Sequence, residues 1–325
     1  MCYKLELQEK NAEKLQEKFK ADNVPEFIIR YFIRLESKIG AINYWIAIKD
    51  LLSWLLDNSI IKRSSISDIT PDDFLGVEAE DITLYLRQKE SSGMSPTTLE
   101  TRKHIFSSFW EYLVSTKKCP VDENIVGSVK YKGIKSTSSL LVRKLPTEEQ
   151  LRQMEQKINK KNDSFVRIRN LAVFHLLKGS GIREGELAGL DMSNLYLDEE
   201  IPCIKALGKG KYRPIEARTV YLTKTAVIYL REWLEVRNLL EVKDVKAVFL
   251  NKNGKRLNED NVQAIFKNYG NGITPHMMRH YYATILANMG NIAFAQQQLG
   301  HSSQNTTINN YTLGSYGMKD ILANM

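Results

Sequence analysis

A break in the apolar pattern between Cys119 and Pro146 divides the sequence into two parts. The chain is polar and basic there, and the segment V-K-Y-K-G-I-K-S-T-S-S is poor in large apolar residues, which is typical of a linker. With 43% apolar residues in 325, the chain can form a sizeable core on each side of the break. We expect a first domain over 1–120, a linker over 121–146 and a second domain over 147–325.

Helical periodicity runs through the first part, and no stretch of it alternates like a strand. The clearest helix is predicted over 95–116, where Ser95 is a candidate N-cap and Pro96 suits the first helical position. We therefore expect a small all-helical domain, with further helices predicted over 4–20, 25–38, 41–58 and 78–90.

The second part combines helices with short strands. Thr147 is a candidate N-cap before acidic residues, and an apolar helical pattern follows over 165–178. Residues 201–222 alternate and carry β-branched side chains around G-K-G-K, which predicts two or three short strands. The whole chain is therefore expected to be mainly α with a small β-sheet, an α+β fold.

The net charge of +8 favours a polyanionic partner, either nucleic acid or an anionic membrane. No apolar run approaches the roughly 20 residues of a membrane span, and the charged N-terminus resembles no signal peptide. The three cysteines are scattered without a C-x-x-C pair, so neither disulfides nor a zinc site is expected and a reducing cytoplasm fits. A basic protein without such a partner stays the alternative.

Basic side chains of the helical part and the linker are candidates for contacts with DNA phosphates. A solvated helix face or a plain solvated linker accounts for the same residues equally simply. The candidates are Arg87, Arg102, Lys103, Lys130, Lys132 and Lys135.

Chemistry-bearing side chains gather between Pro275 and Tyr311. Thr274 is a natural N-cap for a helix starting at Pro275, and His276 and Arg279 are three apart, so one turn places them on the same face. A second short helix is predicted over 292–299, ending at a glycine just before His301.

Cations of this kind fit a phosphate group that gains charge in its transition state. Arg183, in G-S-G-I-R-E-G-E, and Lys209 add two more, and Glu186 is placed to hold the guanidinium of Arg183. Tyr311 could supply a covalent nucleophile. Taken singly, Arg183 also fits a surface ion pair, Lys209 a hairpin tip and Tyr311 ordinary packing. The sequence shows no P-loop, no G-x-G-x-x-G after a strand and no carboxylates at metal-ligand spacing.

The ordered set of motifs resembles the tyrosine recombinase (phage integrase) family. The strings are G-S-G-I-R-E-G-E-L-A-G-L, G-K-G-K, P-H-M-M-R-H-Y-Y-A-T and L-G-H-S-S-Q-N-T-T-I-N-N-Y-T, over about 165–315. The resemblance implies a helical core-binding domain followed by a catalytic domain. It further implies that Arg183 and Arg279 clamp the scissile phosphate, with Glu186 positioning them. The remaining implied roles are Lys209 as proton donor to the leaving 5′ oxygen, His276 in proton transfer, His301 on the phosphate and Tyr311 as nucleophile.

The resemblance also implies a reaction without metal or ATP, through a 3′-phosphotyrosine and a Holliday junction. The expected partners are a double-stranded DNA recombination site and three further copies, giving a homotetramer on two duplexes from free monomers, at the nucleoid in the cytoplasm. Two rivals are a type IB topoisomerase and a non-catalytic DNA-binding regulator. Whether the role is that of an integrase, a resolvase, an invertase or a Xer-like recombinase stays open.

The sequence departs from the family pattern at two places. Tyr311 follows His301 by ten positions, one more than usual, which we expect a loop to absorb. The segment after G-K-G-K is long for the usual strand return, so Lys211 competes with Lys209 as the catalytic lysine. The residues after Tyr311 are expected to pack on a neighbouring subunit or on their own.

Overall fold

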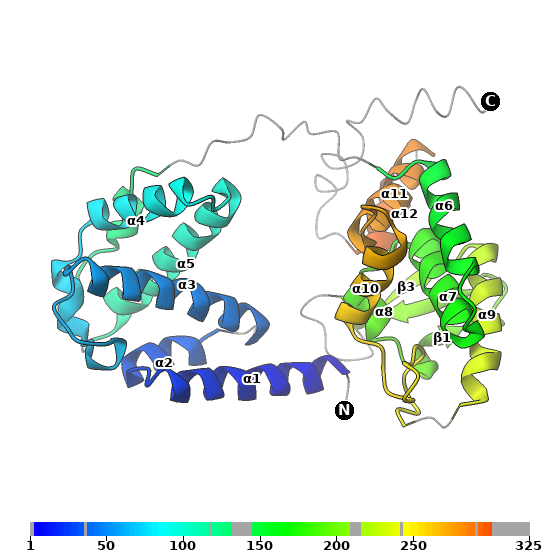
Figure 1. Ribbon diagram of the computed structural model, residues 1–325, viewed down its shortest axis with the longest axis horizontal. Coiled ribbons are helices and arrows are strands. Elements are labelled where there is room, and N and C mark those ends of the chain that lie inside the picture. The colour runs from blue at the N-terminus through cyan, green and yellow to red at the C-terminus, as the bar shows by residue number, and fades with distance from the viewer. Residues whose placement is uncertain are drawn as a thin grey trace. The chain divides into compact units, whose positions relative to one another are not determined.

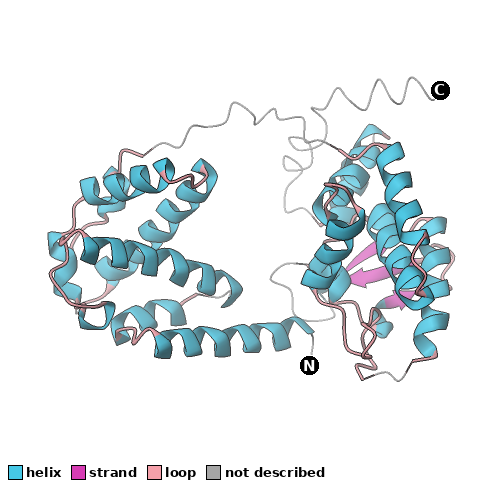
Figure 2. Cartoon of the chain, viewed as in Figure 1, coloured by secondary structure: helices cyan, strands magenta, loops and turns pink. Residues whose placement is uncertain are grey.

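A computed structural model describes residues 3–35, 38–117, 119–131, 145–208, 216–240, 243–289 and 292–300. The chain divides into two compact units, Met1–Thr137 and Ser138–Met325, each with its own hydrophobic core (Figure 1). The architecture is mainly helical with one small sheet, which confirms the expected fold class (Figure 2). None of the helices within the described residues is long and apolar enough to span a bilayer.

The first unit contains only helices among its described residues. Ser95 caps the predicted helix over 95–116, since its hydroxyl accepts a hydrogen bond from the Thr98 amide at 3.2 Å. The predicted helix over 25–38 is shorter than expected, because it ends at Ile33 and a new helix begins at Lys38. The elements are α1 (Tyr3–Ala21), α2 (Glu26–Ile33), α3 (Lys38–Asp57), η1 (Ile66–Asp68), η2 (Pro71–Gly76), α4 (Ala79–Ser91), α5 (Pro96–Ser115) and η3 (Ile125–Ser128).

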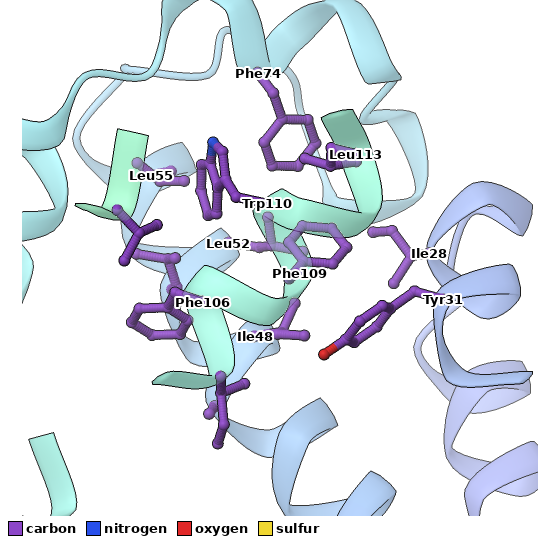
Figure 3. Packing of buried hydrophobic residues seen from close by; sticks show 14 of the residues in the cluster. Ile28, Tyr31, Ile48, Leu52, Leu55, Phe74, Phe106, Phe109, Trp110 and Leu113 are labelled. Atoms are coloured by element: carbon purple, nitrogen blue, oxygen red, sulfur yellow. The ribbon is translucent and has the colours of Figure 1, made fainter. Parts of the chain in front are cut away.

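Aromatic side chains from several helices form the core of this unit. Figure 3 shows Phe106, Phe109 and Trp110 of α5 in one cluster with Tyr31 of α2, Phe74 of η2 and aliphatic residues of α3. The Phe74 and Trp110 rings meet edge to face at 5.7 Å, a geometry that the ring quadrupoles favour. Burying each such side chain stabilises the unit by about 1.5–3 kcal/mol.

The first part of the predicted linker belongs to the first unit. Val121, Val126, Val129 and Tyr131 are buried in its core, and Asn124 caps the short η3 turn. The expected boundary at residue 120 was therefore wrong, because a few apolar residues on irregular chain suffice to dock a segment that is polar on average. The rest of the predicted linker, 132–144, lies outside the described residues.

The second unit surrounds a three-stranded antiparallel sheet with helices. Thr147 caps α6 as predicted, and its reciprocal bonds to Gln150 at 3.2 and 2.9 Å form a capping box. The strands predicted over 201–222 are confirmed, and one further strand precedes them. The elements are α6 (Glu148–Asn159), α7 (Ser164–Ser180), α8 (Glu184–Ala188), η5 (Met192–Asn194), β1 (Leu195–Tyr196), β2 (Cys203–Ala206), β3 (Arg218–Tyr221), α9 (Lys224–Asn238), α10 (Glu259–Tyr269), α11 (Pro275–Asn288) and α12 (Ile292–Leu299).

The buried helix α7 leads into the candidate site. It packs against α9 on one side and α11 on another (Figure 1), and most of its residues from Asn170 to Ser180 are buried. The helix ends at Gly181, whose φ of 62° is in the left-handed region that glycine adopts without strain. The chain thus turns sharply into α8 and places Arg183 at that helix's N-cap position.

Candidate phosphate-binding and catalytic site

Arg183 and Glu186 form the pair that the sequence predicts. Arg183 Nη1 donates to Glu186 Oε1 at 3.0 Å, and the Arg183 backbone amide donates to Glu186 Oε2 at 2.8 Å. The Glu186 side chain is only 2% exposed, whereas that of Arg183 is 38% exposed. The carboxylate therefore anchors the guanidinium from the protein interior and leaves part of it accessible to a ligand.

Arg279 is bound from both sides by backbone carbonyls. The residue is 3% exposed, and its Nη1 and Nη2 donate to Gly181 O at 2.7 Å and to Leu299 O at 2.6 Å. Gly181 lies two residues before Arg183, so α11 brings the second arginine to the turn that carries the first. We refer to Arg183 and Arg279 as the arginine pair.

Besides Arg183, Glu186 binds Arg218, which contacts both of its carboxylate oxygens. Arg218 Nη1 and Nη2 donate to Oε1 and Oε2 at 2.6 and 2.7 Å. Burial raises the pKa of the Glu186 carboxyl, but the hydrogen bonds and charges of Arg218 and Arg183 outweigh this effect and bring its pKa below the usual value. Glu186 is therefore a buried, ionised carboxylate between two guanidinium groups.

His276 lies on the first turn of α11, three residues before Arg279. Thr274 caps this helix as predicted, accepting from the Met277 amide at 3.2 Å. The His276 side chain is exposed, and its Nε2 is 2.7 Å from Nε2 of the buried His280. Because one nitrogen must carry the hydrogen and the other accept it, His280 constrains which tautomer His276 adopts.

Four of the predicted site residues lie outside the described residues: Lys209, Lys211, His301 and Tyr311. Some described residues near Lys209, Lys211 and His301 in the sequence lie close to Arg218. Ala206 and Arg218 face each other in the β2–β3 register, and the Arg218 side chain binds Glu186. Gly300, which precedes His301, is adjacent to Arg218.

The chemistry available at the described part of the site is that of anion binding. Guanidinium groups bind phosphate oxygens through paired hydrogen bonds, and a partly exposed histidine next to them can transfer a proton. No cluster of three or more His, Cys, Asp or Glu side chains suited to a metal ion occurs among the residues that the structure describes.

Two predicted DNA contacts of the first unit have partners inside that unit. Arg102 on α5 is bound to Asp50 and Tyr85, with 13% of its side chain exposed. Lys103 Nζ donates to the carbonyls of Val129 and Tyr131 at 2.9 and 3.3 Å. These contacts give Arg102 and Lys103 a structural role that the sequence did not reveal, since their partners are distant along the chain.

Two other candidates remain accessible. Arg87 is 56% exposed, pairs with Glu90 at 3.1 Å and lies over the Tyr131 ring, and Lys130 is exposed. Their DNA contacts stay predictions. Lys132 and Lys135 lie outside the described residues.

Sequence reasoning did not single out Arg218 or Gln298. Gln298 on α12 is 1% exposed, and its side-chain amide exchanges two hydrogen bonds with the backbone of Tyr221, at 3.1 and 2.7 Å. The only sequence signal for Arg218 was its position at the start of the strand that follows G-K-G-K.

Comparison with known proteins gives consistent matches. A profile of the phage integrase family matches residues 145–316, more than half of the chain. Tyrosine recombinase XerC of Escherichia coli O127:H6 is 29% identical over 237 residues, 70% of this chain and 74% of that protein. Tyrosine recombinase XerC of Proteus mirabilis is 28% identical over 238 residues, 71% of this chain and 73% of that protein.

Solved structures show the same fold. The XerH site-specific recombinase in a post-cleavage complex with a palindromic difH substrate has a TM-score of 0.66 at 20% identity, covering 88% of this chain and 80% of that one. A lambda integrase (75–356) dimer bound to a COC′ core site has a TM-score of 0.61 at 17% identity, covering 88% and 94%. Fold and arginine-centred site together define a tyrosine site-specific recombinase. The chain belongs to the phage integrase family.

Proposed function

We propose that this recombinase cuts and rejoins duplex DNA at a specific site through a covalent bond between Tyr311 and the 3′ phosphate. The observation that carries the proposal is the arginine pair: Glu186 and the Gly181 carbonyl bind two guanidinium groups at one turn of the chain. Preorganised cations of this kind stabilise the charge of a phosphoryl-transfer transition state.

In the proposed reaction, the Tyr311 hydroxyl oxygen attacks the phosphorus and forms the new P–O bond. The bond from phosphorus to the 5′ oxygen breaks, and Lys209, or its rival Lys211, gives a proton to the leaving oxygen. His276 assists the removal of the phenol proton, His301 donates a hydrogen bond to the phosphate, and the arginine pair binds its non-bridging oxygens. The phosphotyrosine ester retains the free energy of the broken phosphodiester bond. A 5′ hydroxyl from another strand can therefore attack it and rejoin the DNA without ATP.

The proposed partners are a double-stranded recombination site and further copies of the chain, four on two duplexes, assembled from monomers. The matched XerH and lambda integrase structures, both complexes with DNA, support a DNA partner, and so does the net charge of +8. We further propose that the protein acts at cytoplasmic DNA, as the recombinase of a mobile element or as a Xer-like resolvase. Selection of the cognate site from random DNA would identify which.

The test of the chemistry is a Tyr311→Phe variant on a nicked suicide substrate carrying the selected site. Loss of the hydroxyl nucleophile should abolish the covalent protein–DNA adduct and leave DNA affinity unchanged. Denaturing gels measure the amount of covalent adduct, and an equilibrium binding assay measures the DNA affinity. Light scattering of the non-cleaving variant on the same DNA should give four chains per two duplexes.

An undiminished adduct in the Tyr311→Phe variant would contradict the assignment of the nucleophile, and Tyr316 is then the next candidate. Arg183→Ala and Arg279→Ala are the companion variants. Both should lower cleavage far more than binding, because their contribution is greatest in the transition state. Equal losses of cleavage and binding would reduce them to positioning contacts. Relaxation of supercoiled DNA without the selected site would point to a topoisomerase instead.

A further inference from the structure

The Glu186 carboxylate has more positive charge around it than one arginine supplies. It binds Arg183 through Oε1 at 3.0 Å and Arg218 through both oxygens at 2.6 and 2.7 Å. The side chain of Arg218 is 14% exposed and that of Glu186 is 2% exposed. A fork-to-fork pair of this kind is the strongest geometry that an arginine and a carboxylate can form.

The charges of these three residues add up to +1, with two guanidinium groups and one carboxylate. Without Arg218 the buried carboxylate would have Arg183 as its remaining cationic partner, and the sum would be zero. A buried carboxylate strongly attracts a single counter-ion. It would then compete with a phosphate for the same guanidinium N–H groups.

Arg218 also contacts the chain that leads to His301. Its Nε donates to the Gln298 carbonyl at 3.2 Å. A Cβ added at Gly300 would lie 2.9 Å from Cδ of Arg218, and the φ of Gly300 is +64°. The Arg218 side chain therefore connects β3 with α8 and with the end of α12. Arg218 is also the first residue of β3, the strand that follows the two candidate lysines in the sequence.

We propose that Arg218 is a positioning residue of the recombinase: it satisfies Glu186 so that Arg183 is available to the scissile phosphate. It acts through Arg183 and Glu186 and does not itself bind DNA. This inference rests on the proposed function, because the readout is cleavage of DNA at the arginine pair.

The primary test compares Arg218→Gln and Arg218→Lys with the wild-type chain in single-turnover cleavage of the suicide substrate. Arg218→Gln should lower the cleavage rate about 10- to 100-fold, the range typical of partners that orient a functional group. DNA affinity should stay within about twofold, since binding is dominated by many other phosphate contacts. Arg218→Lys keeps the charge without the fork and should recover part of the rate.

Two further measurements separate this role from simple loss of structure. In a Glu186→Gln background the competing charge is already absent, so Arg218→Gln should lower the rate less than it does alone. On a substrate whose scissile phosphate is replaced by a neutral methylphosphonate, the defect of Arg218→Gln should also shrink. A purely structural defect would be the same on both substrates.

Arg237→Gln is the matched control, because Arg237 is another buried arginine of the second unit. It donates to the carbonyls of Ala247 and Val245 at 2.9 and 3.0 Å and has no contact with Glu186. This variant should lose stability in thermal unfolding, while its folded fraction cleaves at the wild-type rate on both substrates. Should Arg218→Gln fail to fold, the Arg218→Lys variant on the two substrates gives the same comparison.

The outcomes distinguish this inference from the proposed function. If the wild-type chain forms no covalent adduct, the proposed function fails. If the wild-type chain cleaves and the folded Arg218 variants cleave at the same rate, the positioning role is overturned. It is also overturned if the defect is equal on the charged and the neutral substrate.

Discussion

At the scale of single residues, the site depends on side chains that hold other side chains in place. Glu186 binds the guanidinium of Arg183, and His280 Nε2 lies 2.7 Å from His276 Nε2, so both accessible groups are restrained by buried side chains. Reduced freedom before the reaction lowers the entropy that must be lost in the transition state. Substitutions of the buried residues that contact Arg183 and His276 should therefore change the rate of DNA cleavage.

His280→Phe tests this at the histidine pair. The phenyl ring retains the burial of His280 but removes the Nε2 that lies 2.7 Å from His276 Nε2. We expect cleavage to fall about tenfold, less than the roughly 10²- to 10⁴-fold effect of losing general acid–base catalysis altogether. Single-turnover cleavage measured against His276→Phe gives the comparison.

His175→Phe is the control, because His175 is also buried and contacts Glu155 and Tyr229 instead of the site. Its effect should be confined to stability. If His280→Phe and the control cleave equally well, His280 has no part in orienting His276.

At the scale of elements, the helices could be predicted and their mutual contacts could not. Capped helices such as α5, α6 and α11 begin where Ser95, Thr147 and Thr274 predict, because capping and periodicity are local properties. The Arg218–Glu186 contact joins residues 32 apart and the Arg102–Asp50 contact residues 52 apart. Their pairing depends on how the elements pack, which no local pattern encodes.

The same limit explains the misplaced domain boundary and the unforeseen internal partners of Arg102 in the first unit. The sequence predicts DNA contact for Arg102 because the residue lies on a helix of uncertain outer face. It predicts a linker from residue 121 because polar residues outnumber the buried Val121, Val126 and Val129. In both cases the tertiary partner decides the role.

Asp50 connects α3, α4 and α5, and its removal should loosen the first unit. It accepts hydrogen bonds from Lys89 at 2.7 Å, from Tyr85 at 2.8 Å and from Arg102. Because the Asp50 side chain is 32% exposed, we expect Asp50→Asn to cost about 1–3 kcal/mol at pH 7. Urea unfolding of the wild-type and variant chains gives the difference.

The pH dependence of that difference has a definite sign. Burial raises the pKa of Asp50, but bonds from Lys89, Arg102 and Tyr85 outweigh it and lower the pKa below the usual value. A carboxyl with a lowered folded-state pKa stabilises the protein above its unfolded pKa of about 3.9. The gap between wild type and Asp50→Asn should therefore be full at neutral pH and shrink as the pH falls below that value. A gap that widens on acidification would contradict the ionic role.

At the scale of the whole molecule, two separate cores predict two unfolding events. Three tryptophans, Trp45, Trp54 and Trp110, lie in the first unit and Trp233 lies in the second. In a Trp233→Phe variant, tryptophan fluorescence reports on the first unit alone, while circular dichroism reports on both. We expect the fluorescence transition in urea to differ from the overall one.

Adding Asp50→Asn to that variant should shift the fluorescence transition and leave the remaining circular dichroism transition in place. One coincident transition by both probes, moving together in the double variant, would show that the two units unfold as one.

The Gln298 amide has a consequence for how copies of this chain meet one another. Its two bonds to Tyr221 saturate backbone groups along the outer edge of β3, and α12 packs against that strand. An uncovered edge invites pairing with a strand of any other chain, which leads to aggregation. The Gln298 side chain therefore prevents a strand of another copy from pairing with β3 at Tyr221.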